Sequence, residues 1–140
     1  MKMTLRLSGF VLFLFGTMFL FGGCTTKQAY EGSKLPRESV AVIKPTTGAI
    51  DQTIIVQVDG VAGKTRVIAE EIFEVLPGEH TVVIRAISGW FPVYFTRERT
   101  LSFNARAGRV YRVEGKVRDG KAIVWIEDET TNEVVAGERQ

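Results

Sequence analysis

His80 is the single histidine of this 140-residue chain, so any mechanism that uses an imidazole depends on it. It lies just after the turn residues Pro77 and Gly78, where a ring nitrogen can bond to a turn carbonyl. A general base needs an oriented partner and a nucleophile within reach. No serine of the chain lies in a G-x-S-x-G turn, which would present a nucleophile. We therefore expect His80 to stabilise a turn, and we predict no catalytic residues; a hydrolase that uses His80 is the less favoured alternative.

Carboxylates are adjacent in Glu70-Glu71 and in Glu127-Asp128-Glu129. Neighbours in a strand point to opposite faces, so we expect these side chains to be solvated and not paired for acid–base catalysis. A calcium site built from the second group and Glu133 needs six to eight converging oxygens, which it reaches only with backbone carbonyls. One histidine and one cysteine exclude a His/Cys zinc site and an iron–sulfur cluster. We predict no metal and no cofactor.

The densest aromatic stretch of the mature chain runs from Trp90 to Phe95, with Pro92 in its middle. Proline confines the stretch to a sheet edge or a loop. Either its aromatic side chains cap the end of a small sandwich, or they form an exposed patch for a partner, a glycan or a membrane interface. Arginine beside exposed aromatic side chains is common on binding surfaces. The candidate partner-binding residues are Trp90, Phe91, Tyr94, Phe95, Arg97 and Arg99.

The N-terminal segment has the pattern of an export signal. Lys2 and Arg6 precede an apolar run over residues 7–21, and Gly22-Gly23-Cys24 follows. A transmembrane helix needs about 20 apolar residues, so this run is short for an uncleaved span. An unpaired thiol is also a liability in an oxidising compartment unless it is modified. We predict a signal peptide over residues 1–23.

The ending Leu20-Phe21-Gly22-Gly23-Cys24 resembles the lipobox of bacterial lipoprotein precursors. The resemblance implies that Cys24 is lipidated and becomes the first mature residue. Two or three acyl chains would then hold the domain at a membrane, because a single chain anchors only marginally. Thr25 and Thr26 stand where the family's inner-membrane retention signal has aspartate, which implies an outer-membrane location facing the periplasm.

Charge is nearly balanced, with 18 basic and 16 acidic residues. Lys2 and Arg6 account for the surplus, so basicity does not favour a nucleic-acid partner. Basic residues dominate positions 97–121, whereas positions 127–138 hold acidic residues and no basic ones. We expect the two groups to pair across a hairpin.

From residue 39 onward, apolar and polar residues alternate with period two between turn residues. The pattern predicts strands near 40–44, 52–59, 66–75, 80–88, 97–105, 109–118, 121–128 and 133–136. Turns are expected at Asp59-Gly60, Pro77-Gly78, Ala107-Gly108 and Asp119-Gly120. The fold class is all-β: a small antiparallel β-sandwich of seven or eight strands over residues 39–140. Residues 24–38 lack periodicity and are expected to be a lipid-anchored tether or an edge segment.

Val58-Asp59-Gly60, followed by Pro77-Gly78-Glu79-His80, resembles the turn pattern of PEGA-type β-domains. A wider similarity includes Tyr30-Glu31-Gly32 and Trp125-Ile126-Glu127-Asp128, and it points to a group of small secreted and lipid-anchored proteins of Gram-negative bacteria. These motifs imply a fold and carry no catalytic residue. The expected function is a non-enzymatic envelope lipoprotein, a binding or structural module whose partners are the membrane and an envelope protein or glycan. A periplasmic glycan- or peptidoglycan-binding module is the alternative.

Overall fold

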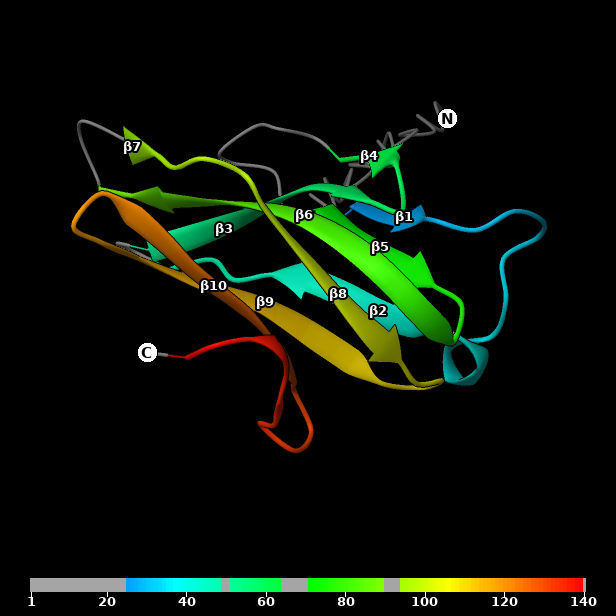
Figure 1. Ribbon diagram of the computed structural model, residues 1–140. Helices are drawn as coiled ribbons and strands as arrows, with labels where there is room; N and C mark the ends of the chain where they lie inside the picture. The colour runs from blue at the N-terminus through cyan, green and yellow to red at the C-terminus, as the bar shows by residue number, and fades with distance from the viewer. Residues whose placement is uncertain (1–24, 49–50, 64–70, 90–93, 140) are drawn as a thin grey trace, which may run out of the picture.

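The computed structural model describes residues 25–48, 51–63, 71–89 and 94–139. Two β-sheets face each other in this part of the chain, as Figure 1 shows. The first sheet has the strand order β1-β5-β2-β9-β10-β11. Its strands are β1 (Thr25–Gln28), β5 (Glu71–Val75), β2 (Ala41–Pro45), β9 (Val110–Arg118), β10 (Lys121–Asp128) and β11 (Val134–Gly137). The 3₁₀ helix η1 (Arg37–Ser39) precedes β2.

The second sheet has β6 at its centre, with β3 and then β4 on one side of it. Along the other side of β6 lie β8 and the short β7, which pair with different parts of the same strand. These strands are β3 (Asp51–Val58), β4 (Val61–Ala62), β6 (Gly78–Ser88), β7 (Tyr94–Phe95) and β8 (Arg99–Ala105).

The all-β sandwich predicted from period two is confirmed. Each expected strand segment contains a strand; residues 66–70 of the third segment lie outside the described residues. Two pairings, β1 with β5 and β2 with β9, are parallel, so the sheets are not antiparallel throughout. The strands β1, β4 and β7 have no counterpart in the prediction, and each is four residues long or shorter.

The core lies between the sheets, where alternate residues of each strand point inward. Phe103 of β8 packs edge-to-face on Tyr111 of β9, with ring centroids 4.7 Å apart. Around them lie buried aliphatic side chains such as Ile43, Val82 and Ile84. This contact between β8 and β9 joins the two sheets near the end of the sandwich where both strands meet the turn at Ala107-Gly108.

The predicted turns at Asp59-Gly60, Ala107-Gly108 and Asp119-Gly120 are present, and at Pro77 the chain bends between β5 and the first residue of β6, Gly78. Asp59 and Gly60 have φ of 47° and 81°, and Asp119 and Gly120 have φ of 51° and 72°. Two consecutive positive values define the two-residue hairpin turn that matches the twist of its strands. The first turn joins β3 to β4, and the second joins β9 to β10.

The segment before β2 begins as part of the sheet. Thr25–Gln28 pair in parallel with Glu71–Glu74 of β5, and the N–H of Ala29 donates to the Glu74 carbonyl at 2.9 Å. The amide of Gln28 then donates to the carbonyls of Tyr30 and Gly32, which fixes the turn that follows. The sequence left open whether this segment is a tether or an edge segment, and residues 25–28 form an edge strand. No free linker therefore separates position 24 from the sheet.

Candidate functional site

His80 makes two bonds within the fold. Its Nε2 lies 2.5 Å from the carbonyl oxygen of Leu76, which confirms the predicted bond to a turn carbonyl. Its Nδ1 lies 2.5 Å from Oδ2 of Asp59. The ring is buried, and both nitrogens are engaged. His80 therefore holds the β5–β6 turn against the β3–β4 turn and offers no free nitrogen to a substrate.

The carboxylates of β10 differ from the expectation that they are solvated. Glu127 and Asp128 are 1% and 4% exposed, so this expectation is wrong for both. The reason is a set of donors around them: Arg112 of β9, Arg139 beyond β11 and the indole N–H of Trp125 in β10 itself all bond to Glu127, and Arg109 pairs with Asp128. Buried carboxylates persist when such partners are present.

The expected pairing of the basic and acidic segments is confirmed. Arg112 of β9 stands directly opposite Glu127 of β10 and forms an ion pair with it. Burial alone would raise the pKa of Glu127, but the hydrogen bonds from Arg112, Trp125 and Arg139 outweigh it and hold that pKa below its usual range. The same hydrogen bond raises the pKa of Arg112. This cluster is a stabilising network whose charges are already matched.

The described residues also contain no group of three or more His, Cys, Asp or Glu side chains that could hold a metal ion. Glu71, which belongs to the first carboxylate pair of the sequence, is buried in β5.

The aromatic segment supplies the exposed apolar surface. Tyr94 and Phe95 form β7, which pairs with Ser88 and Ile87 at the end of β6. Their side chains are 64% and 52% exposed, the largest values among the described large hydrophobic residues. The interpretation in which they cap the sandwich therefore does not hold for these two. The candidates Trp90 and Phe91 lie outside the described residues.

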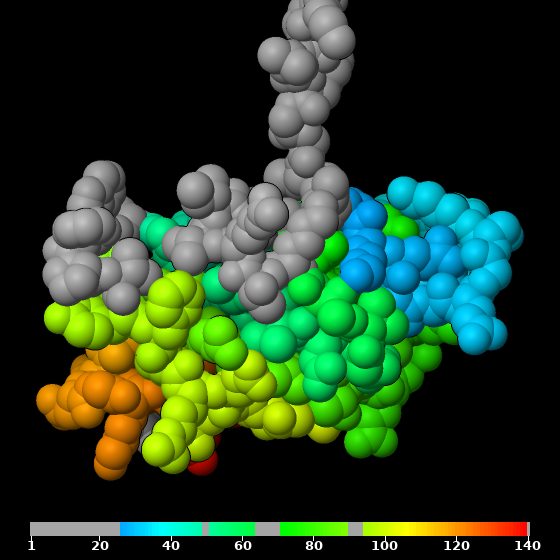
Figure 2. Space-filling model, turned by 90° about the horizontal axis from the view of Figure 1, so that it is seen from above, coloured from blue at the N-terminus to red at the C-terminus, as the bar shows by residue number. Residues whose placement is uncertain are grey.

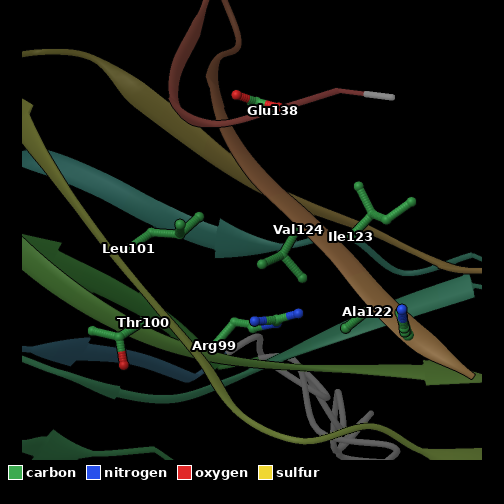
Figure 3. A pocket seen from close by; sticks show the side chains of 8 residues that line it. Arg99, Thr100, Leu101, Ala122, Ile123, Val124 and Glu138 are labelled. Atoms are coloured by element: carbon green, nitrogen blue, oxygen red, sulfur yellow. The ribbon is translucent and has the colours of Figure 1, made fainter.

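Arg97 and Arg99 line a cleft that is formed jointly by residues of two strands in different sheets. One hollow of about 470 Å³ lies between β8 and β10, and a second of about 420 Å³ adjoins it and shares Arg99, Lys121 and Ala122. In Figure 3 the Arg99 side chain extends across the cleft toward Ala122 and Val124. Seen from above, the tip of the β9–β10 hairpin lies beside the residues that connect β7 to β8 (Figure 2). The first hollow is lined by Arg99, Thr100, Leu101, Lys121, Ala122, Ile123, Val124 and Glu138.

The cations of this cleft are not neutralised by the fold. Arg97, Arg99 and Lys121 form no ion pair within the described part of the chain, whereas Glu98 is paired with Arg85 through a 2.5 Å contact. Glu138 is the acidic residue left on the lining. Lys121 was missed from the sequence because its strand belongs to the other sheet, and only the packing of the two sheets brings it to Arg99. The candidate site thus combines the exposed β7 side chains with a basic cleft.

The predicted lipidation residue, Cys24, lies outside the described residues. The next residue, Thr25, is the first of β1. Over the described ranges, the structure contains no helix of the length and apolarity that a membrane span requires.

Comparisons of this chain with protein-family models, with curated proteins and with solved structures find no match.

Proposed function

We propose that this chain is a non-enzymatic lipoprotein of the bacterial cell envelope that binds another envelope component. Its signal peptide would be removed before Cys24, and the lipidated cysteine would anchor the domain, in the outer membrane and facing the periplasm. The short apolar run, the two glycines and the single thiol of the N-terminus support the anchor. The turn motifs that resemble PEGA-type domains support a small β-module held at the membrane surface.

The start of β1 at Thr25 adds a geometric consequence to this proposal. A lipid on Cys24 would connect to the first sheet without a spacer, because Thr25 already pairs with Glu71. The domain would then sit directly on the bilayer and present its surfaces at a fixed distance from it. Such an arrangement suits a module that meets partners at the membrane surface.

One observation supports the binding function: Tyr94 and Phe95 remain exposed just before Arg97 and Arg99, two cations of the cleft. An aromatic side chain left in water contributes little to the core but can contribute a large contact area to a partner. Arginine at the rim adds hydrogen-bond donors in a planar fork. The engaged nitrogens of His80 favour this function over hydrolysis.

The test is crosslinking in intact envelopes with the chain and a Tyr94→Ala/Phe95→Ala variant. Truncating a central anchor costs about 2 kcal/mol of binding or more, which is roughly a thirtyfold loss of affinity. We expect the crosslinked products to disappear, while the thermal midpoint stays nearly unchanged because both side chains are exposed. Leu76→Ala is the matched control, since Leu76 is also exposed but lies at the opposite end of β6.

Mass spectrometry of the mature N-terminus tests the anchor in the same cells. A diacylated or triacylated Cys24 is expected as the first residue. A peptide that still contains Met1, or crosslinking that does not depend on Tyr94 and Phe95, would contradict the proposal. Capture of a glycan in place of a protein would select the alternative, a glycan- or peptidoglycan-binding module.

A further inference from the structure

The strand β10 is covered by β11 for only part of its length. β9 pairs with β10 over Lys121–Asp128, but β11 pairs on the other side at Trp125–Glu127 alone. The stretch from Lys121 to Ile123 therefore has one strand beside it within the described residues, and its other edge opens into the cleft. At Val124 the backbone of Gly137 already approaches the carbonyl oxygen. An exposed strand edge is a template for pairing with another chain.

The geometry of the β9–β10 turn at Asp119-Gly120 determines which backbone N–H and C=O groups of β10 point away from β9. In a two-residue hairpin the flanking residues, here Arg118 and Lys121, exchange ladder hydrogen bonds. Alternation then turns the N–H and C=O of Lys121 and Ile123 toward β9, and it turns both groups of Ala122 and the N–H of Val124 toward the open edge. The carbonyl oxygen of Val124 already lies against Gly137 of β11. Asp128 follows the same alternation, since its N–H donates to Glu133 on the β11 side. The cleft thus offers unpaired donors and acceptors at strand spacing.

The wall opposite is formed by β8, the edge strand of the second sheet. β8 pairs with β6 on one side and has no partner on the other in the part of the chain that the structure describes. Leu101, Ala122 and Val124 give the cleft an apolar floor. Arg99 reaches over that floor, as Figure 3 shows. An added strand would therefore meet apolar contacts and a guanidinium on the same side.

The positive charge of the residues that line the cleft favours an acidic ligand. Arg97, Arg99 and Lys121 are without ion pairs in the described ranges, and the one carboxylate that remains on the lining is Glu138. An acidic segment would bring carboxylates to these cations, and charge-assisted hydrogen bonds are roughly twice as strong as neutral ones. A basic segment would be repelled.

We propose that this cleft binds an extended acidic segment of a partner polypeptide, which pairs with the open edge of β10 at Ala122–Val124 as an added strand. The inference rests on the proposed binding function and deepens it by naming the partner's chemistry. Main-chain hydrogen bonds supply the affinity in this mode of recognition, and the side-chain pockets supply the specificity.

The probe is a fluorescent eight-residue peptide of alternating valine and glutamate, added to the lipidated chain in detergent micelles. We expect saturable binding by fluorescence anisotropy. The same peptide methylated on alternate backbone nitrogens should lose at least about tenfold in affinity, since it cannot donate to the strand edge. A peptide with lysine in place of glutamate should not bind.

Hydrogen exchange followed by nuclear magnetic resonance distinguishes strand pairing from non-specific adsorption of the peptide. On peptide binding, hydrogen exchange should slow at the amides of Ala122 and Val124, whose N–H groups face the open edge. The amides of Ile123 and Trp125 are the internal reference, because they already bond to β9 and should change little.

Arg99→Glu and Lys121→Glu should each weaken binding by at least about tenfold. Arg106→Glu is the matched control: Arg106 is exposed just beyond the far end of β8, outside the cleft, and its charge reversal should leave affinity unchanged. All three side chains are exposed, so the variants should fold, and the thermal midpoint verifies this.

Equal binding of the methylated peptide, or indifference to Arg99→Glu and Lys121→Glu, would overturn the inference. Binding of vesicles of anionic phospholipid that displaces the peptide, with no change at Ala122, would assign the cleft to a lipid surface and also overturn it. If the peptide fails while envelope crosslinking still depends on Tyr94 and Phe95, the binding function stands and only the added strand is wrong.

Discussion

The carboxylate of Asp59 joins two turns that are far apart in the sequence. Its Oδ2 lies 2.5 Å from Nδ1 of His80, and its Oδ1 accepts the backbone N–H of Thr81 at 2.7 Å. Asp59 holds a positive φ of 47° at the β3–β4 turn, and His80 bonds at the same time to the Leu76 carbonyl of the β5–β6 turn. One side chain therefore fixes the position of β6 relative to both turns.

We expect Asp59→Ala to be more destabilising than its place in an exposed turn suggests. It removes two hydrogen bonds at about 1 kcal/mol each and leaves a less tolerant residue at positive φ. Asp119→Ala is the matched control, because Asp119 has φ of 51° before a glycine and its side chain forms no hydrogen bond or ion pair with the described part of the chain. Urea unfolding should show Asp59→Ala to be the less stable by about 2 kcal/mol.

His80→Ala should lose the two bonds of the ring, about 1 kcal/mol each, and leave envelope crosslinking intact. Equal stability of Asp59→Ala and Asp119→Ala would contradict the role assigned to the Asp59 carboxylate. Loss of crosslinking in a folded His80→Ala variant would instead support the hydrolase alternative.

Acid should destabilise the fold through Glu127. Because donors from Arg112, Trp125 and Arg139 hold its pKa below the unfolded value of about 4.3, the ionised carboxylate stabilises the folded state above that value. This contribution is present at neutral pH and is lost as pH falls through the lower, folded pKa. Glu127→Gln should therefore cost about 3 kcal/mol at pH 7, and the difference from the native chain should shrink toward zero at strongly acidic pH.

The measurement is urea unfolding followed by tryptophan fluorescence, since Trp125 is buried beside Glu127. Glu133→Gln serves as control, because Glu133 is exposed in the β10–β11 turn and should give no such pH dependence. A difference between Glu127→Gln and the native chain that stays constant from pH 7 to pH 2 would show that the network does not act through this charge.

The strands were predictable where period two extends over five or more residues between turn glycines, as in β3, β9 and β10. β4 and β7 were not, because two residues carry no periodicity and their pairing is decided by β3 and β6. The adjacent carboxylates were expected to be solvated, but Glu127 of β10 is buried. It is dry because Arg112 and Arg139 cover it, and neither donor could be assigned from one strand's pattern.

The candidate site was predictable only in part. Pro92 confined the aromatic stretch to an edge or a loop, but it left open whether Tyr94 and Phe95 cap the sandwich or lie exposed, and the structure shows them exposed. The cleft did not follow, since Arg99 and Lys121 belong to different sheets and meet through sheet packing. β11 ends at Gly137, whose φ of 74° is a conformation that favours glycine, and this end leaves the edge of β10 open at Ala122.

Removing β1 should weaken the domain without unfolding it. A chain that begins at Tyr30 loses the parallel pairing of Thr25–Gln28 with β5 and the contact of Ala29 with the core. We expect its thermal midpoint to fall by roughly 5 to 10 °C relative to a chain that begins at Thr25, and we expect it to associate more readily through the bare edge of β5. Differential scanning calorimetry and size-exclusion chromatography of the two chains measure both effects. Identical behaviour would mean that residues 25–29 act as a tether after all.

Gly115 is required by a close approach between the two sheets. A Cβ at this position of β9 would lie 2.7 Å from Cγ2 of Thr53, and Thr53 cannot rotate away freely because its hydroxyl donates to the Val113 carbonyl at 2.7 Å and accepts the N–H of Thr46 at 2.9 Å. Gly115→Ala should therefore cost about 1 to 3 kcal/mol by overpacking.

The structure also specifies how to relieve that clash. Thr53→Ser removes the methyl group that the new Cβ would meet and keeps the hydroxyl that bonds to Val113 and Thr46. The double variant Gly115→Ala/Thr53→Ser should accordingly be more stable than Gly115→Ala alone, although Thr53→Ser by itself should be slightly destabilising through the lost methyl. A double-mutant cycle from urea unfolding measures this coupling. Simple additivity of the two substitutions would show that the sheets part locally at Gly115 and that its contact with Thr53 does not set their spacing.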